Sequence, residues 1–174
     1  MKFGASAWPF KWEAPFEDTI VRIAKLGFQA VELIAWDRSV LDEYYTPRKI
    51  KELKDIITSE GLELSQFVSS PSLMASPVES ERKEALEHFK KLVEVGKELG
   101  TKIVNSVAPY PFSMDFPRIA ERPLVQEQIV NIPGNLDWSK NWEDYIEVLR
   151  ECASICEDAE IRYSLEPHPY RYVS

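Results

Sequence analysis

The sequence is poor in the residues that mark several classes of protein. It has two cysteines, Cys152 and Cys156, and two histidines in 174 residues. A disulfide scaffold needs a far higher cysteine content, and two thiols four residues apart on a helix point poorly for a strain-free bridge. We therefore expect two reduced thiols in the core, in preference to a redox or metal-binding pair.

Long apolar runs and an excess of basic residues are also missing. No run reaches the roughly 20 apolar residues that span a bilayer, and the first eight residues contain no apolar core of a signal peptide. The formal net charge of −8 repels phosphate backbones and anionic lipid. The sequence therefore predicts a cytoplasmic protein that binds neither nucleic acid nor membranes.

A unit repeats along the chain, in which a helical stretch ends at glycine and a β-rich run follows at once. The junctions are Gly27 before residues 28–34, Gly61 before residues 62–68 and Gly100 before residues 101–107. Glycine just past a helix end accepts the left-handed conformation that terminates helices. A fourth junction, between a helix over about 142–158 and the run 161–166, lacks the glycine but is of the same kind.

The remaining segments complete an alternating order of strands and helices. Apolar residues recur at helical spacing over about 16–26, 47–57 and 76–99. Thr46 precedes Pro47 as a cap, and Ser76 precedes a proline and Glu79 in a capping pattern. With residues 2–7 as an opening strand, five strands alternate with four helices, which indicates a parallel sheet.

The turns after the first strands help to choose between a doubly wound nucleotide-binding sheet and a (β/α)8 barrel, because both begin with this order of elements. A dinucleotide fold needs a glycine-rich turn after its first strand, and a phosphate loop needs Gly-Lys-Ser or Gly-Lys-Thr; neither occurs. Trp8-Pro-Phe10 and Ala35-Trp36-Asp37 follow the first two strands instead. Aromatic strand ends suit a pocket for a sugar ring better than a phosphate cradle.

One connection is unusually long. Residues 108–140, rich in proline and aromatic residues, separate the fourth strand from its helix. A loop of that length in a compact domain is usually an active-site cover or a binding element. Because residues 109–112 and 132–136 contain packable apolar groups, we expect it to be ordered.

Three short motifs resemble the metal-dependent sugar isomerases and epimerases of the xylose isomerase-like barrel superfamily. They are Gly27-Phe-Gln-Ala-Val-Glu-Leu33, Glu60-Gly-Leu-Glu-Leu64 and Ser164-Leu-Glu-Pro-His168. The resemblance covers essentially the whole chain and implies an α/β fold, a parallel (β/α)8 TIM barrel. That barrel has eight strands in about 250 residues. We therefore expect residues 1–174 to be a single domain, the N-terminal part of a barrel truncated after its fifth strand.

The same resemblance implies a catalytic role for Glu166, which closes the fifth strand. In the family this glutamate binds a divalent metal ion and is one of two catalytic carboxylates, which suits proton transfer on a carbon next to a carbonyl. The other ligands, an aspartate, a histidine and a second glutamate, come from later strands. The chain thus supplies one ligand of about four, and we expect it to be inactive alone. The resemblance does not distinguish Mn, Mg, Co and Zn as the bound ion.

Further polar and aromatic residues are candidates for the substrate site. The candidates for sugar contact are Trp8, Trp36, Phe67, Asn105, His168 and Arg171. For the three aromatic residues, packing at the barrel rim is an equal alternative to sugar contact. For Asn105 the alternative is a hydrogen bond to the nearby backbone. Glu32 on the second strand is expected to make an internal polar bond beside the pocket, while His88 is expected to face solvent.

Three functions follow from these features. The favoured one is metal-dependent isomerisation or epimerisation of a sugar through an enediolate, with assembly into a homo-oligomer left open. A non-catalytic sugar-binding barrel is the first alternative. An apurinic-type endonuclease is the second, and it needs histidine ligands where this sequence has Trp36, Ser69 and Ser106.

Overall fold

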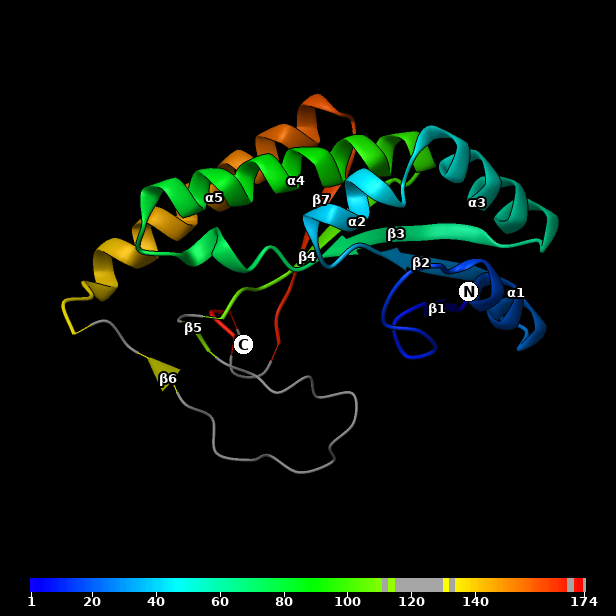
Figure 1. The fold of residues 1–174 in the computed structure, drawn as a ribbon, viewed down its shortest axis with the longest axis horizontal. Coiled ribbons are helices and arrows are strands. Elements are labelled where there is room, and N and C mark those ends of the chain that lie inside the picture. Colours follow the sequence, from blue (N-terminus) through cyan, green and yellow to red (C-terminus); the bar gives the residue numbers. More distant parts are fainter. Residues whose placement is uncertain (111–112, 115–129, 132–133, 169–170, 174) are drawn as a thin grey trace.

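Five parallel strands form one sheet in the order in which they occur along the chain. The computed structural model describes residues 1–110, 113–114, 130–131, 134–168 and 171–173. The sheet contains β1 (Gly4–Ser6), β2 (Ala30–Ile34), β3 (Glu63–Ser69), β4 (Ile103–Val107) and β7 (Arg162–Glu166), each hydrogen-bonded to the next (Figure 1). A doubly wound sheet reverses its strand order at a switch point. The unreversed order confirms the sequence preference for the barrel architecture.

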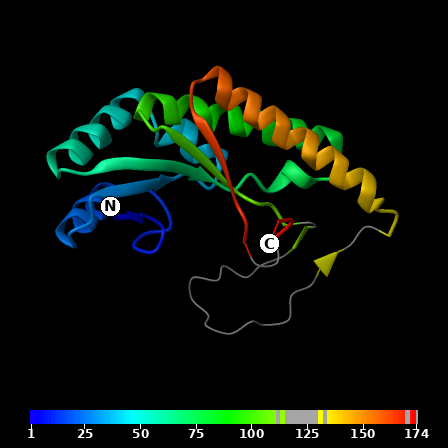
Figure 2. The same cartoon turned by 180° about the vertical axis from the view of Figure 1, so that it is seen from behind.

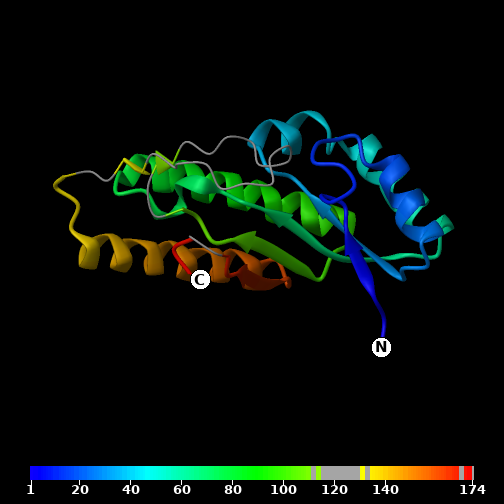
Figure 3. The same ribbon diagram turned by 90° about the horizontal axis from the view of Figure 1, so that it is seen from below.

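Helices cover one face of this sheet. The helical elements are α1 (Glu17–Lys25), α2 (Arg38–Glu43), α3 (Pro47–Ser59), η1 (Ser72–Ala75), α4 (Glu79–Leu99) and α5 (Trp138–Asp158). Figures 1 and 2 show α4 and α5 side by side across the sheet, and Figure 3 shows the strands from below. The core lies between the two layers, where Phe67, Val104 and Phe89 are fully buried. No helix in the described ranges is long and apolar enough to cross a membrane.

The junctions between helices and strands follow the predicted design. Gly27, Gly61 and Gly100 have φ of 86°, 71° and 87°, the left-handed conformation that ends a helix. At the fourth junction Glu160 has φ 60° and takes the same role without being glycine. All four turns deliver a strand into the same sheet, and the predicted parallel order is confirmed.

The helix starts were predicted less well. Thr46 caps α3 as expected, because its side chain accepts a hydrogen bond from Lys49 N. The prediction for Ser76 was wrong: α4 begins at Glu79 after Val78, and Ser76 Oγ accepts from Val78 N at 3.0 Å upstream of the helix. Sequence analysis did not predict α2 and η1. It placed the start of the last helix at about residue 142, but α5 begins at Trp138 because the side chain of Asp137 caps it.

The long connection after β4 carries a small ladder of its own. Strands β5 (Ser113–Met114) and β6 (Val130–Asn131) pair antiparallel within it. The connection ends earlier than the predicted range of 108–140, since α5 starts at Trp138. Residues 111–112, 115–129 and 132–133 lie outside the described residues, and with them most of the segments expected to pack.

Candidate functional site at the carboxyl ends of the strands

Polar side chains gather on the sheet face that points away from the helices. On β7, Tyr163 packs edge-on against Phe89 of α4, with ring centroids 5.2 Å apart, so Tyr163 faces the helix layer. Successive strand side chains alternate between faces. Glu166, three positions later, therefore lies on the opposite face, at the end of β7 where a parallel barrel carries its chemistry.

Glu166 is held by an amide from the neighbouring strand. Asn105 Nδ2 on β4 donates a hydrogen bond to Glu166 Oε2 at 2.8 Å. The strand register explains this contact, because Val107 pairs with Glu166 and Asn105 lies two residues earlier on the same face. Asn105 is 2% exposed, whereas Glu166 is half-buried. Within the described chain, Oε1 of Glu166 accepts no hydrogen bond, so one carboxylate oxygen is oriented and the other is available.

Glu32 is the second carboxylate on this face, and its neighbours engage it more completely. Ser6 Oγ donates to Oε1 of Glu32, and Gln66 Nε2 donates to Oε2. The three side chains join β1, β2 and β3. Because each of its oxygens accepts a hydrogen bond, Glu32 makes the internal polar contacts that the sequence suggested.

Arg171 lies just beyond the ends of β3 and β4. Its Nη1 donates to Ala108 O at 3.2 Å and approaches Ser70 Oγ at 3.4 Å, and its guanidinium stacks over the ring of Tyr110 at 3.5 Å. Burial lowers the pKa of Arg171, while Tyr110 and Glu166 oppose that shift. The guanidinium therefore sits in a partly desolvated place within electrostatic reach of Glu166.

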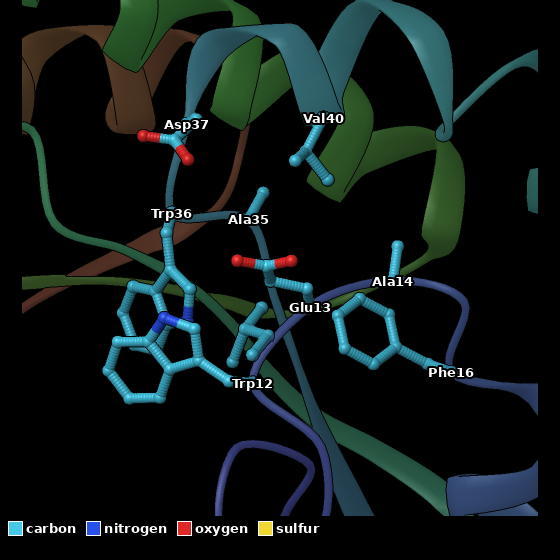
Figure 4. Close-up of a pocket in the computed structure, with 9 residues that line it drawn as sticks. Trp12, Glu13, Ala14, Phe16, Ala35, Trp36, Asp37 and Val40 are labelled. Carbon is cyan, nitrogen blue, oxygen red and sulfur yellow. The ribbon is translucent and has the colours of Figure 1, made fainter. Parts of the chain in front are cut away.

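A pocket of about 220 Å³ opens between the loop after β1 and the end of β2. Figure 4 shows Trp12 and Trp36 lying face to face at its edge, with ring centroids 4.9 Å apart and an interplanar angle of 25°. Glu13 and Asp37 carry carboxylates into the same lining. The indole Nε1 of Trp36 is buried without a hydrogen-bond partner among the residues described.

The sequence singled out Trp36 but missed Trp12. Trp12 lies in the irregular loop before α1, and no periodicity of that loop pointed to a stacked partner. Trp8 is 48% exposed and meets Trp12 edge-on at 6.2 Å between ring centroids, so it extends the aromatic group outward.

The structure places Phe67 away from the polar group and leaves His168 exposed. Phe67 is fully buried on the helix side of β3, where it packs against Tyr45 with ring centroids 5.0 Å apart. Packing, the alternative weighed for this residue, accounts for it, and we do not keep it as a sugar contact. His168 is exposed, and its backbone N–H donates to Val173 O at 3.1 Å.

The prediction that His88 faces solvent was wrong. Its side chain is half-buried, and Nε2 lies 3.3 Å from Oγ of Ser69 at the end of β3. Burial lowers the pKa of His88, and Arg38 adds to the shift, while Asp37 and Asp42 oppose it. The charged neighbours Glu87 and Lys90 suggested an exposed position, but His88 lies one residue from buried Phe89 and turns toward α2 and the sheet.

The described residues do not by themselves fit a metal centre. No group of three or more His, Cys, Asp or Glu side chains is placed to hold an ion within this part of the chain. Glu166 is a suitable oxygen donor, but one carboxylate is too few for a divalent ion, which takes several protein or water ligands. Cys152 and Cys156 are free and buried in the core, as predicted.

Known proteins resemble this chain along nearly its whole length. A family model described as xylose isomerase-like TIM barrel matches residues 20–174. The curated D-psicose 3-epimerase of Ruminiclostridium cellulolyticum is 25% identical over 161 residues, covering 91% of this chain and 48% of that protein. The chain therefore spans about half the length of this relative.

Solved structures give the same fold. A D-psicose 3-epimerase from Clostridium cellulolyticum H10 with D-tagatose has a TM-score of 0.73 at 24% identity and covers 99% of this chain and 55% of its own. A xylose isomerase-like TIM barrel protein from Mycobacterium smegmatis in complex with magnesium has a TM-score of 0.70 at 20% identity, covering 99% and 57%. The 3-keto-D-glucoside 4-epimerase of E. coli has a TM-score of 0.67 at 18% identity, covering 98% and 57%.

Proposed function

The chain belongs to the xylose isomerase-like TIM barrel family, and we propose that it acts in the epimerisation of a sugar at a carbon next to a carbonyl. The proteins it resembles carry names of sugar epimerases that act at different carbons. One observation within the chain carries the proposal: Glu166 stands at the carboxyl end of β7 with one oxygen fixed by Asn105. We keep isomerisation of a sugar as the closely related alternative reaction.

In this proposal Glu166 removes the proton from the reacting carbon. A general base must reach the proton within hydrogen-bond distance and hold its orientation. The bond from Asn105 Nδ2 fixes Oε2, and Oε1 remains to face a substrate. Glu32 is the poorer base, because Ser6 and Gln66 occupy both of its oxygens.

The aromatic pocket supplies the proposed surface for the sugar. Trp12 and Trp36 present stacked rings, and apolar sugar faces pack well on indole rings. Trp8 extends this surface, and His168 is kept as an outlying contact that an exposed loop residue can make. Asn105 and Arg171 are the proposed polar contacts next to Glu166.

We also propose that the complete protein uses a divalent ion, with Glu166 as one ligand. Such an ion would stabilise negative charge on an oxygen of the substrate. Because the described residues offer no further ligand cluster, the other ligands must come from elsewhere in the protein. If so, Mn²⁺ or Mg²⁺ raises the melting temperature of the full-length protein, and Glu166→Gln weakens that rise. Equal stabilisation of both proteins would argue against a metal role for Glu166.

The alternative of a non-catalytic sugar-binding barrel draws on the same pocket and on the lack of a ligand cluster within the described part of the chain. Incubating the full-length protein with D-fructose, D-psicose or D-tagatose separates the two functions. The epimerase proposal predicts a second ketose by chromatography, at least about 100-fold less of it with Glu166→Gln, and no loss with the exposed control Glu157→Gln. Sugar binding without any conversion would support the alternative.

A further inference from the structure

The aromatic pocket has two walls that come from different parts of the chain. The loop before α1 contributes Trp12 and Phe16, and the end of β2 contributes Ile34 and Trp36 (Figure 4). Trp12 is 48% exposed, so burial holds its ring only in part. The stacking of Trp12 on Trp36, with ring centroids 4.9 Å apart, therefore depends on how firmly the loop and the strand end are anchored.

Tyr44 anchors the loop wall. Its hydroxyl accepts a hydrogen bond from the backbone N–H of Phe16, the residue before α1, at 3.0 Å and donates to Glu17 Oε2 at 3.1 Å. Lys49 donates to the other carboxylate oxygen of Glu17. The rings of Phe16 and Tyr44 also meet edge-on, with centroids 5.7 Å apart. One side chain thus fixes the end of the loop that carries Trp12.

Tyr45 anchors the strand wall. Its hydroxyl donates to the backbone oxygen of Ile34, the last residue of β2, at 2.7 Å. The Tyr45 side chain is 3% exposed and packs edge-on against Phe67 of β3, with ring centroids 5.0 Å apart. Because Trp36 follows Ile34 by two residues, this bond holds the strand end from which the indole projects.

The two tyrosines are joined to each other as well as to the pocket. They follow α2 directly, and their rings meet edge-on with centroids 5.0 Å apart. The backbone N–H groups of Tyr44 and Tyr45 donate to Val40 O at 3.1 and 3.2 Å, and Val40 itself lines the pocket. Burial raises the pKa of both phenols, so each hydroxyl keeps the proton that it donates. A dipeptide therefore connects the loop wall to the strand wall.

We propose that Tyr44 and Tyr45 are positioning residues, which set the stacking of Trp12 on Trp36 and with it the shape of the pocket. Each acts through a residue of the wall that its hydroxyl binds. Rings held in place before a ligand arrives reduce the entropy lost on binding. The inference stands on these contacts for the two rings, and it rests on the proposed function for the ligand that they receive.

The first test uses the full-length protein labelled with fluorotryptophan, in which the ¹⁹F signals of Trp12 and Trp36 are identified by their loss in Trp12→Phe and Trp36→Phe. Tyr44→Phe and Tyr45→Phe keep the ring contacts and remove one hydroxyl each, so both variants should fold. Each should shift or broaden both signals, because the two indoles are stacked. Tyr145→Phe is the control, since the hydroxyl of this buried tyrosine has no partner in the described part of the chain.

A merely structural role for the two hydroxyls gives a different result. Both variants would then have a lower melting temperature, while the Trp12 and Trp36 signals would stay where they are in the parent protein. That outcome overturns the proposal. Shifted signals in Tyr44→Phe and Tyr45→Phe, with unchanged signals in Tyr145→Phe, support it.

A second test titrates D-psicose into the same labelled proteins and follows the Trp12 signal. Loss of one anchoring hydrogen bond should raise the half-saturation concentration about threefold to tenfold in Tyr44→Phe and in Tyr45→Phe, and Tyr145→Phe should match the parent. An unchanged half-saturation concentration in both variants would show that ring position does not govern binding and would contradict the proposal. If D-psicose leaves the parent signals in place, the sugar surface of the proposed function fails, while the positioning of the rings stands or falls by the first test.

Discussion

The side-chain amide of Asn105 on β4 donates to Oε2 of Glu166 on β7 across 2.8 Å, although the two residues are 61 positions apart. The contact exists because the parallel register sets Val107 opposite Glu166 and brings Asn105 onto the same face. An oriented carboxylate at a strand end thus depends on a strand whose sequence shows no catalytic motif. The same geometry distinguishes Glu166 from Glu32, whose two oxygens are both engaged.

Replacing Glu32 should affect stability more than replacing Glu166. In Glu32→Leu, the donors of Ser6 and Gln66 lose their partners, and half-buried unsatisfied donors cost about 1–3 kcal/mol. Glu166→Gln keeps an oxygen that can accept from Asn105 and should lower the free energy of unfolding by less than about 1 kcal/mol. Urea denaturation of both variants checks this. A Glu32→Leu variant as stable as the parent would contradict the hydrogen-bond network that joins Ser6, Glu32 and Gln66.

Gly96 should tolerate no side chain. A Cβ there would lie 3.1 Å from Val104 Cγ2 and 3.2 Å from Thr101 Cγ2, where α4 crosses β4. Although alanine favours helix, Gly96→Ala should therefore lower the free energy of unfolding by about 1–3 kcal/mol through overpacking. Gly134→Ala is the control, since a Cβ at that glycine meets nothing within 4 Å. Equal stability of the two variants in thermal unfolding would refute the close contact.

His88 should make stability fall with acid. Burial and Arg38 lower its pKa below the usual 6.5, despite opposing Asp37 and Asp42. As pH drops below about 6.5, the unfolded chain takes up the proton first, so the native state loses stability until pH passes the folded pKa. In His88→Gln this part of the pH dependence should disappear, whereas His168→Gln at the exposed histidine should retain it. Urea midpoints at pH 7.5, 6 and 5 measure the difference.

The two cysteines should resist thiol reagents in the native protein. Cys152 and Cys156 are 0% and 1% exposed, and burial raises the pKa of Cys156 to about 11 and that of Cys152 further. Reaction requires an accessible thiolate. Mass spectrometry after maleimide treatment should therefore find no adduct under native conditions and two after unfolding in urea. Rapid native labelling would mean that α5 opens or packs differently.

The order of elements could be predicted because it depends on local signals. Gly27, Gly61 and Gly100 mark helix ends through backbone conformation alone, and each has the positive φ that the sequence predicted. The prediction that Ser76 caps α4 was wrong because a serine followed by proline can also form a turn just before a helix. The short α2 carries too few residues for helical periodicity to be detected.

The site was predictable only in part, because it depends on contacts between distant segments. Glu166 was identified from its motif at a strand end, but its partner required the β4–β7 register. Trp12 stacks on Trp36 across 24 residues of chain, and no spacing rule relates the two. His88 reaches Ser69 between helix and sheet, where neighbouring charges on α4 gave the opposite expectation.

Solvent exchange at the reacting carbon tests the central claim, proton transfer by Glu166, most directly. The full-length protein is incubated in D₂O with D-fructose or D-psicose, and deuterium on the carbon next to the carbonyl is followed by NMR. The account predicts that deuterium enters as the epimer forms, and that Glu166→Gln abolishes both while Glu157→Gln retains both. Epimerisation without deuterium, or undiminished exchange in Glu166→Gln, would contradict it.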